Sequence, residues 1–107
     1  MTGGPVALVR CENYEQAAVD AAVERAISLI GGIERYVRPG QRVLVKPNLL
    51  RGSDPSEGIV THPSVVRAVA SLARDAGGRV VIGDSPGGAF SPSALRRVYA
   101  KSGMEIQ

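Results

Sequence analysis

The sequence predicts an α/β fold with a small parallel β-sheet, and two observations support this class. Short, continuous apolar runs alternate along the chain with longer segments in which apolar residues recur every three or four positions. The short runs are typical of strands covered on both faces, and the longer segments are typical of helices packed on a core. The resulting order, βαβαβα, implies parallel strands, right-handed crossovers and three layers.

The first strand is expected over residues 5–10, a continuous apolar run too short for a helix. A helix should follow, because Asn13 and Gln16 fit a capping box and apolar residues then recur at helical spacing. The pair Gly31-Gly32 is expected to end this helix.

A second strand is expected over residues 42–46, between a turn at Pro39-Gly40 and Pro47, which stops the strand. Residues 48–62 show no periodicity and predict a long loop, a kind that is usually functional or mobile. Pro63 should open a second helix at its first position, and Gly77-Gly78 should close it.

The remaining residues predict a third strand over 79–83 and a third helix that begins at Ser91-Pro92 and ends at Gly103. Such a sheet would be small and would keep a long apolar edge. We therefore expect residues 1–107 to form a single α/β domain, the amino-terminal part of a longer architecture.

Composition narrows the function classes. The 13 Lys and Arg residues are spread among 10 acidic residues without a run, and aromatic residues make up 4% of the chain, which argues against nucleic-acid binding. No apolar run approaches the length of a membrane span, so we expect no membrane contact and a cytoplasmic location. One cysteine, Cys11, cannot form an internal disulfide, and no iron–sulfur cluster is expected from this chain alone.

Polar residues follow the expected strands at their carboxyl ends, where parallel sheets bind ligands. Lys46 and Asn48 follow the second strand, and we expect them to hold and orient a carboxylate or phosphate. The alternative is a lysine that ends a strand in solvent and an asparagine that makes a turn.

Asp84 and Ser85 follow the third strand, and His62 stands before the second helix, so the topology places all three at the same edge. Asp84 and His62 are candidate metal ligands, and a neutral His62 is also a candidate base. The alternatives are backbone hydrogen bonds within a turn for Asp84 and Ser85, and a local cap for His62. The sequence does not specify a cofactor.

Common nucleotide motifs are absent. The segment after the third strand lacks G-x-x-x-x-G-K-[ST], and the first strand–helix turn lacks G-x-G-x-x-G. The expected fold is therefore Rossmann-like without a dinucleotide fingerprint.

Three motifs in this order, residues 43–49 (VLVKPNL), Thr61-His62-Pro63 and residues 81–87 (VIGDSPG), resemble the domain-of-unknown-function 362 family. The resemblance covers nearly the whole chain. Members are generally longer, and many are fused to a ferredoxin-like segment or described as iron–sulfur proteins. The resemblance therefore implies a redox setting with a ferredoxin-like domain or protein as partner, although this chain lacks the C-x₂-C-x₂-C-x₃-C-P run.

Two functions from different classes follow. In the first, Lys46, Asn48, His62, Asp84 and Ser85 bind an anionic ligand or metal beside a redox partner domain. In the second, the chain is a non-catalytic assembly or binding domain, such as a homo-oligomer, that pairs through an exposed sheet edge. A truncated product without independent activity is a third interpretation. The sequence does not decide whether the chain is an enzyme.

Overall fold

The computed structural model describes residues 3–48, 54–58, 60–83, 96–97 and 100. Its two main helices are α1 (Gln16–Leu29) and α2 (Pro63–Asp75), and its strands are β1 (Arg42–Val45) and β2 (Arg79–Ile82). The 3₁₀ turns η1 (Ile33–Arg35) and η2 (Pro55–Glu57) lie in the connections. The described elements confirm the α/β class and the predicted order from α1 to β2.

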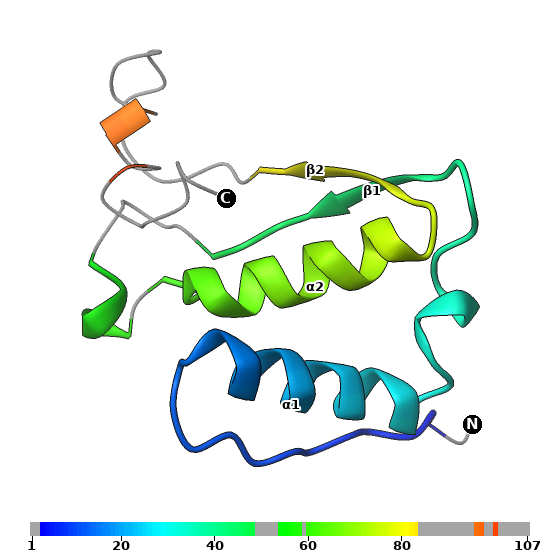
Figure 1. Ribbon diagram of the computed structural model, residues 1–107, viewed down its shortest axis with the longest axis horizontal. Coiled ribbons are helices and arrows are strands. Elements are labelled where there is room, and N and C mark those ends of the chain that lie inside the picture. The colour runs from blue at the N-terminus through cyan, green and yellow to red at the C-terminus, as the bar shows by residue number, and fades with distance from the viewer. Residues whose placement is uncertain (1–2, 49–53, 59, 84–95, 98–99, 101–107) are drawn as a thin grey trace.

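The two strands pair in parallel, with Val43 opposite Val80 and Leu44 opposite Val81. One face of this sheet packs on α2, which contacts both strands, and α1 packs on the other side of α2 (Figure 1). The described residues therefore stack in the order sheet, α2, α1. The predicted three-layer arrangement, with helices on both faces of the sheet, is not confirmed for these residues.

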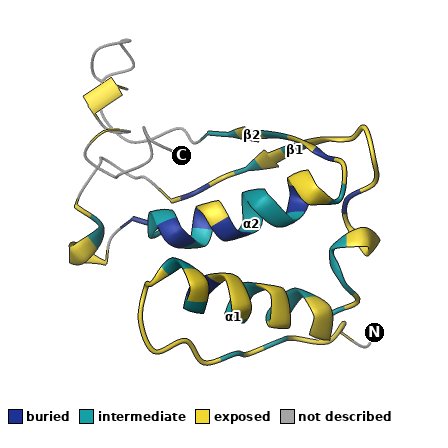
Figure 2. Cartoon of the chain, in the orientation of Figure 1, coloured by how far each residue is buried: buried dark blue, intermediate teal, exposed yellow. Residues whose placement is uncertain are grey.

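The core lies around α2. Val66, Ala68 and Ala73 of this helix are buried, and the dark blue segments in Figure 2 concentrate there, whereas most of α1 is exposed or half-buried. The buried residues of α2 are covered by elements on two sides, because α2 contacts both the sheet and α1.

Both helices end at the predicted glycines. Gly31 and Gly77 adopt φ values of 118° and 94°, which L side chains rarely adopt. At the end of α2, the amide of Gly78 donates to the carbonyl of Ala73 at 2.9 Å and the amide of Gly77 donates to that of Arg74 at 2.9 Å. This is a Schellman motif, which satisfies the last carbonyls of the helix and turns the chain into β2.

The strand expected over residues 5–10 is wrong, because the structure has no strand there. The segment runs beside α1, with Val6 92% and Leu8 95% exposed. Only alternate residues, Ala7 and Val9, are half-buried. An apolar run predicts a buried strand only if both of its faces meet other elements, and here one face meets solvent.

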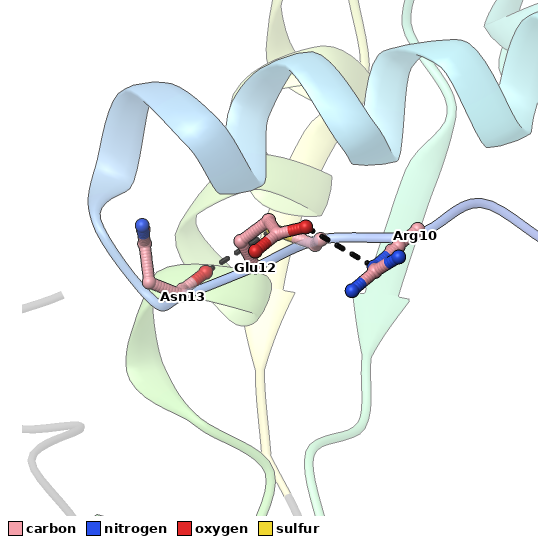
Figure 3. A network of polar contacts seen from close by, with 4 residues as sticks. Arg10, Glu12 and Asn13 are labelled. Atoms are coloured by element: carbon pink, nitrogen blue, oxygen red, sulfur yellow. Dashed lines mark hydrogen bonds and ion pairs between the residues drawn. The ribbon is translucent and has the colours of Figure 1, made fainter.

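The start of α1 also differs from the prediction. Glu15, not Asn13, is the N-cap, and its side chain makes no capping bond. Asn13 instead accepts a hydrogen bond from the Glu15 amide through Oδ1 at 2.9 Å, which forms an Asx turn. Figure 3 shows Asn13 beside the ion pair between Arg10 Nε and Glu12 Oε1, which lie 3.1 Å apart and are largely exposed.

The predicted third helix falls mostly outside the described residues, of which Arg96, Arg97 and Ala100 are helical. Within the described part of the chain, no helix has the length and apolar content needed to cross a membrane.

Candidate functional site

The candidate site lies at the edge where β1 and β2 end. The strands end side by side, because Val45 pairs with Ile82 and the amide of Gly83 donates to the carbonyl of Val45 at 3.1 Å. Lys46 is the next residue after Val45 and is exposed. The chain therefore leaves both strands at one edge, as parallel pairing requires.

Pro47 and Asn48 anchor the segment after β1. The Pro47 side chain is fully buried, and Asn48 is bonded twice to Thr61. The Asn48 amide donates to Thr61 Oγ1 at 2.7 Å, and the Thr61 amide donates to the Asn48 carbonyl at 3.0 Å. These bonds join the two ends of the connection between β1 and α2, so that Lys46, Asn48 and His62 lie on two short segments tied together.

His62 is the N-cap of α2. Its Nδ1 accepts the amide hydrogen of Ser64 at 3.1 Å and lies 2.8 Å from Ser64 Oγ. Ser64 is 6% exposed, so an unpaired amide there would cost about 1–3 kcal/mol. Nδ1 therefore carries a lone pair toward Ser64. The alternative interpretation of His62 as a local helix cap is correct. The second ring nitrogen, Nε2, remains for another role.

The first backbone amides of α2 either lack a hydrogen or already donate a hydrogen bond within the chain. Pro63 has no amide hydrogen, Ser64 donates to the His62 ring, and the amides of Val65 and Val66 donate to the His62 carbonyl at 3.0 and 3.3 Å. A helix amino terminus binds an anion through such amides when they are open. At this helix, an anion would be held by side chains instead.

Two residues of the α1 region also reach this edge, and the sequence did not predict their contacts there. Tyr14 stacks on the His62 ring with centroids 4.0 Å apart and planes 5° apart. Gln16 donates from Nε2 to the Ser64 carbonyl at 2.9 Å. No local sequence pattern predicts a contact between residues that are 48 positions apart. The available signal in the sequence was an aromatic residue, Tyr14, just before the predicted helix.

Of the five predicted site residues, the structure bonds Asn48 to Thr61, the residue before His62, and places Lys46 two positions before Asn48. Asp84 and Ser85 lie outside the described residues. Among the residues that are described, no group of three or more His, Cys, Asp and Glu side chains is placed to hold a metal ion. The ligand-binding role of all five residues stays a prediction.

Comparison with known proteins identifies the family. A family model described as "Domain of unknown function (DUF362)" matches residues 43–106, more than half of the 107 residues. The chain belongs to the DUF362 family. The DUF362 match begins in β1 and includes all five predicted site residues, whereas α1 and Tyr14 precede it.

A curated relative extends the similarity. The thylakoid-associated protein sll1697 of Synechocystis sp. (strain PCC 6803) is 44% identical to the chain over 81 residues, which are 76% of this chain and 25% of the relative. The chain therefore spans about a quarter of the length of the relative that it matches. No solved structure matches this DUF362 chain.

Proposed function

We propose that this DUF362 chain binds an anionic ligand at the carboxyl edge of β1 and β2. The observation that carries the proposal is the pair of hydrogen bonds between Asn48 and Thr61, at 2.7 and 3.0 Å. This pair holds the segment with Lys46 against the segment with His62. The segment that follows β1 and the segment that precedes α2 therefore lie side by side at the edge where parallel sheets bind ligands.

Each residue has a distinct task in this proposal. Lys46, which is exposed, supplies the charge that attracts a carboxylate or phosphate. Asn48 keeps its backbone bonded to Thr61, so its amide side chain projects from a fixed point. Asp84 and Ser85, which follow Gly83 in sequence, are proposed to complete the site, Asp84 with His62 as an alternative metal pair.

The first experiment measures inorganic phosphate binding by isothermal titration calorimetry. Replacing Lys46 with Met keeps an unbranched side chain and removes the charge, and should weaken phosphate binding about tenfold or more, because a charged hydrogen bond contributes about 1.5–3 kcal/mol. The matched control is Arg42→Met, which removes a cation from the opposite end of the same strand. If the two substitutions weaken phosphate binding equally, the binding results from general charge attraction, and the proposal is contradicted.

We also propose, from the family resemblance, that this site works in a redox or iron–sulfur-associated protein with a ferredoxin-like domain or partner. Cys11 is the single cysteine of the chain, so the cluster ligands would belong to that partner. Anaerobic purification of the complete protein from its native source, followed by visible absorption and electron paramagnetic resonance spectroscopy, tests this setting. A complete protein without iron would contradict it.

One observation favours a second function, assembly through the sheet. Leu44 and Val81 are cross-strand partners on the face away from α2, and they are 66% and 52% exposed. Neighbouring exposed apolar residues are typical of surfaces that another chain covers. If this face joins two copies, light scattering should show a dimer that Leu44→Lys converts to a monomer. A monodisperse monomer of the unmodified chain would remove this alternative.

A further inference from the structure

The ring of His62 has two nitrogens, and the structure gives them different surroundings. Nδ1 is engaged by Ser64 through its amide and lies close to its hydroxyl. Among the described residues, no group forms a hydrogen bond with Nε2. Because an amide nitrogen can only donate, a neutral ring that accepts at Nδ1 must carry its hydrogen on Nε2.

Tyr14 limits the orientation of the same ring. Its aromatic ring lies flat on one face of the imidazole, with 4.0 Å between centroids, while Ser64 holds the Nδ1 edge. The contact is itself braced, because Gln16, two residues after Tyr14, bonds to the Ser64 carbonyl at 2.9 Å. One face and one edge of His62 are therefore held by separate parts of the chain, which leaves the Nε2 edge with a defined direction.

We propose that Tyr14 is a positioning residue that aims the Nε2 hydrogen of His62 at an oxygen of the bound ligand. This inference rests on the proposed anion site and names its ligand class, an oxyanion such as a carboxylate or phosphate. A protonated Nε2 has no lone pair to offer a metal ion, so His62 in this tautomer donates to an anion. This inference therefore excludes the alternative metal pair of His62 with Asp84. The α1 region, outside the family match, thereby contributes to the site.

The tautomer is tested without any ligand. Long-range proton–nitrogen correlation spectra of the ¹⁵N-labelled chain, recorded at alkaline pH where imidazole holds one ring hydrogen, assign that hydrogen to one nitrogen. We expect a protonated Nε2 and an unprotonated Nδ1. Tyr14→Phe, which keeps a stacked ring, should preserve this pattern, and Tyr14→Ala should shift both nitrogens toward an average of the two tautomers. A hydrogen on Nδ1 in the unmodified chain would overturn the inference.

Phosphate titration then tests whether the Nε2 hydrogen of His62 is directed at the ligand. Tyr14→Ala should weaken binding about 2- to 10-fold, in line with the contribution of an aromatic pair, and Tyr14→Phe should bind as the unmodified chain does. His62→Asn keeps an N-cap acceptor for Ser64 but lacks Nε2, and should lose about tenfold in affinity while its circular dichroism spectrum is unchanged.

The two proposals fail in different ways. If Lys46→Met weakens phosphate binding and Tyr14→Ala does not, the anion site stands and the positioning role of Tyr14 is overturned. If Lys46→Met and Arg42→Met have equal effects, the anion site itself is overturned, and the role of Tyr14 at that site falls with it. If Tyr14→Ala loses helical circular dichroism, its weaker phosphate binding is a folding effect. Tyr14→Leu, which fills the same place without a ring, then serves as the test. Phosphate binding by Tyr14→Leu equal to that of the unmodified chain would overturn the positioning role of Tyr14.

Discussion

At the scale of single residues, the edge of the sheet is held by a few polar bonds that a sequence motif does not reveal. Asn48 and Thr61 are 13 positions apart and exchange two hydrogen bonds, and His62 caps α2 through its ring. These bonds give the Thr61 hydroxyl and the His62 ring a structural role even before a ligand is considered. The proposed ligand-binding role of Asn48 and His62 would thus be added to a structural one.

The Thr61 hydroxyl should contribute to stability through Asn48. We expect Thr61→Val to lower the free energy of unfolding by about 0.5–1.5 kcal/mol, because the Asn48 amide loses its acceptor at 2.7 Å. Urea denaturation followed by circular dichroism measures this change. Thr61→Ser keeps the hydroxyl and should lose less; a serine variant as unstable as the valine variant would mean that the methyl group, and not the hydrogen bond, matters.

At the scale of elements, α2 organises the described part of the molecule. Its first residue is Pro63, its end is a Schellman motif at Gly77, and it contacts both strands as well as α1. The close approach of its carboxyl end to β1 requires a residue without a side chain at position 78. A Cβ placed on Gly78 would lie 2.9 Å from the Ala73 carbonyl oxygen and 3.0 Å from Val43 Cγ2.

Gly78→Ala should therefore destabilise the chain by about 1–3 kcal/mol, the usual cost of overpacking a close contact. Thermal unfolding measured by calorimetry would detect this loss. Gly4→Ala is the matched control, since a Cβ there meets nothing within 4 Å, and its effect should stay within about 0.5 kcal/mol. If the two alanine variants unfolded at the same temperature, the tight packing between α2 and β1 would be refuted.

At the scale of the whole molecule, apolar surface is distributed unevenly. The core is built around α2, whereas Val6, Leu8, Leu44 and Val81 are exposed on the amino-terminal segment and on the uncovered face of the sheet. A groove of about 550 Å³ also lies between residues 7–14 and α1. These surfaces are the structural basis of the assembly alternative.

The arrangement of the amino-terminal segment can be tested by paired truncations. Leu8→Ala should change the free energy of unfolding by no more than about 0.5 kcal/mol, because Leu8 is 95% exposed. Val66→Ala should cost about 1–3 kcal/mol, because Val66 is 2% exposed and its loss leaves a cavity. Urea denaturation of both variants measures the difference, and a comparable loss for Leu8→Ala would restore the buried strand that the sequence predicted.

Local signals in the sequence determined the α/β class, the family and the start and end of α2, and they placed β1 and β2 to within one residue. Proline at the start of α2, proline after β1 and glycine after each helix act on the backbone within a few residues, so their effects do not depend on the rest of the fold. The same reasoning placed Lys46, Asn48 and His62 at one edge, because parallel strands end together.

Only the tertiary structure decided the fate of residues 5–10, the position of α1 on α2, and the stacking of Tyr14 on His62. An apolar run indicates that burial is favourable, but it does not indicate which surface is available to cover it. A ring contact between two distant segments likewise depends on how the helices pack. The ends of helices and strands depend on neighbouring residues, and the sequence therefore predicts them. Burial and ring contacts depend on segments that are distant in the sequence, and only the tertiary structure brings these together.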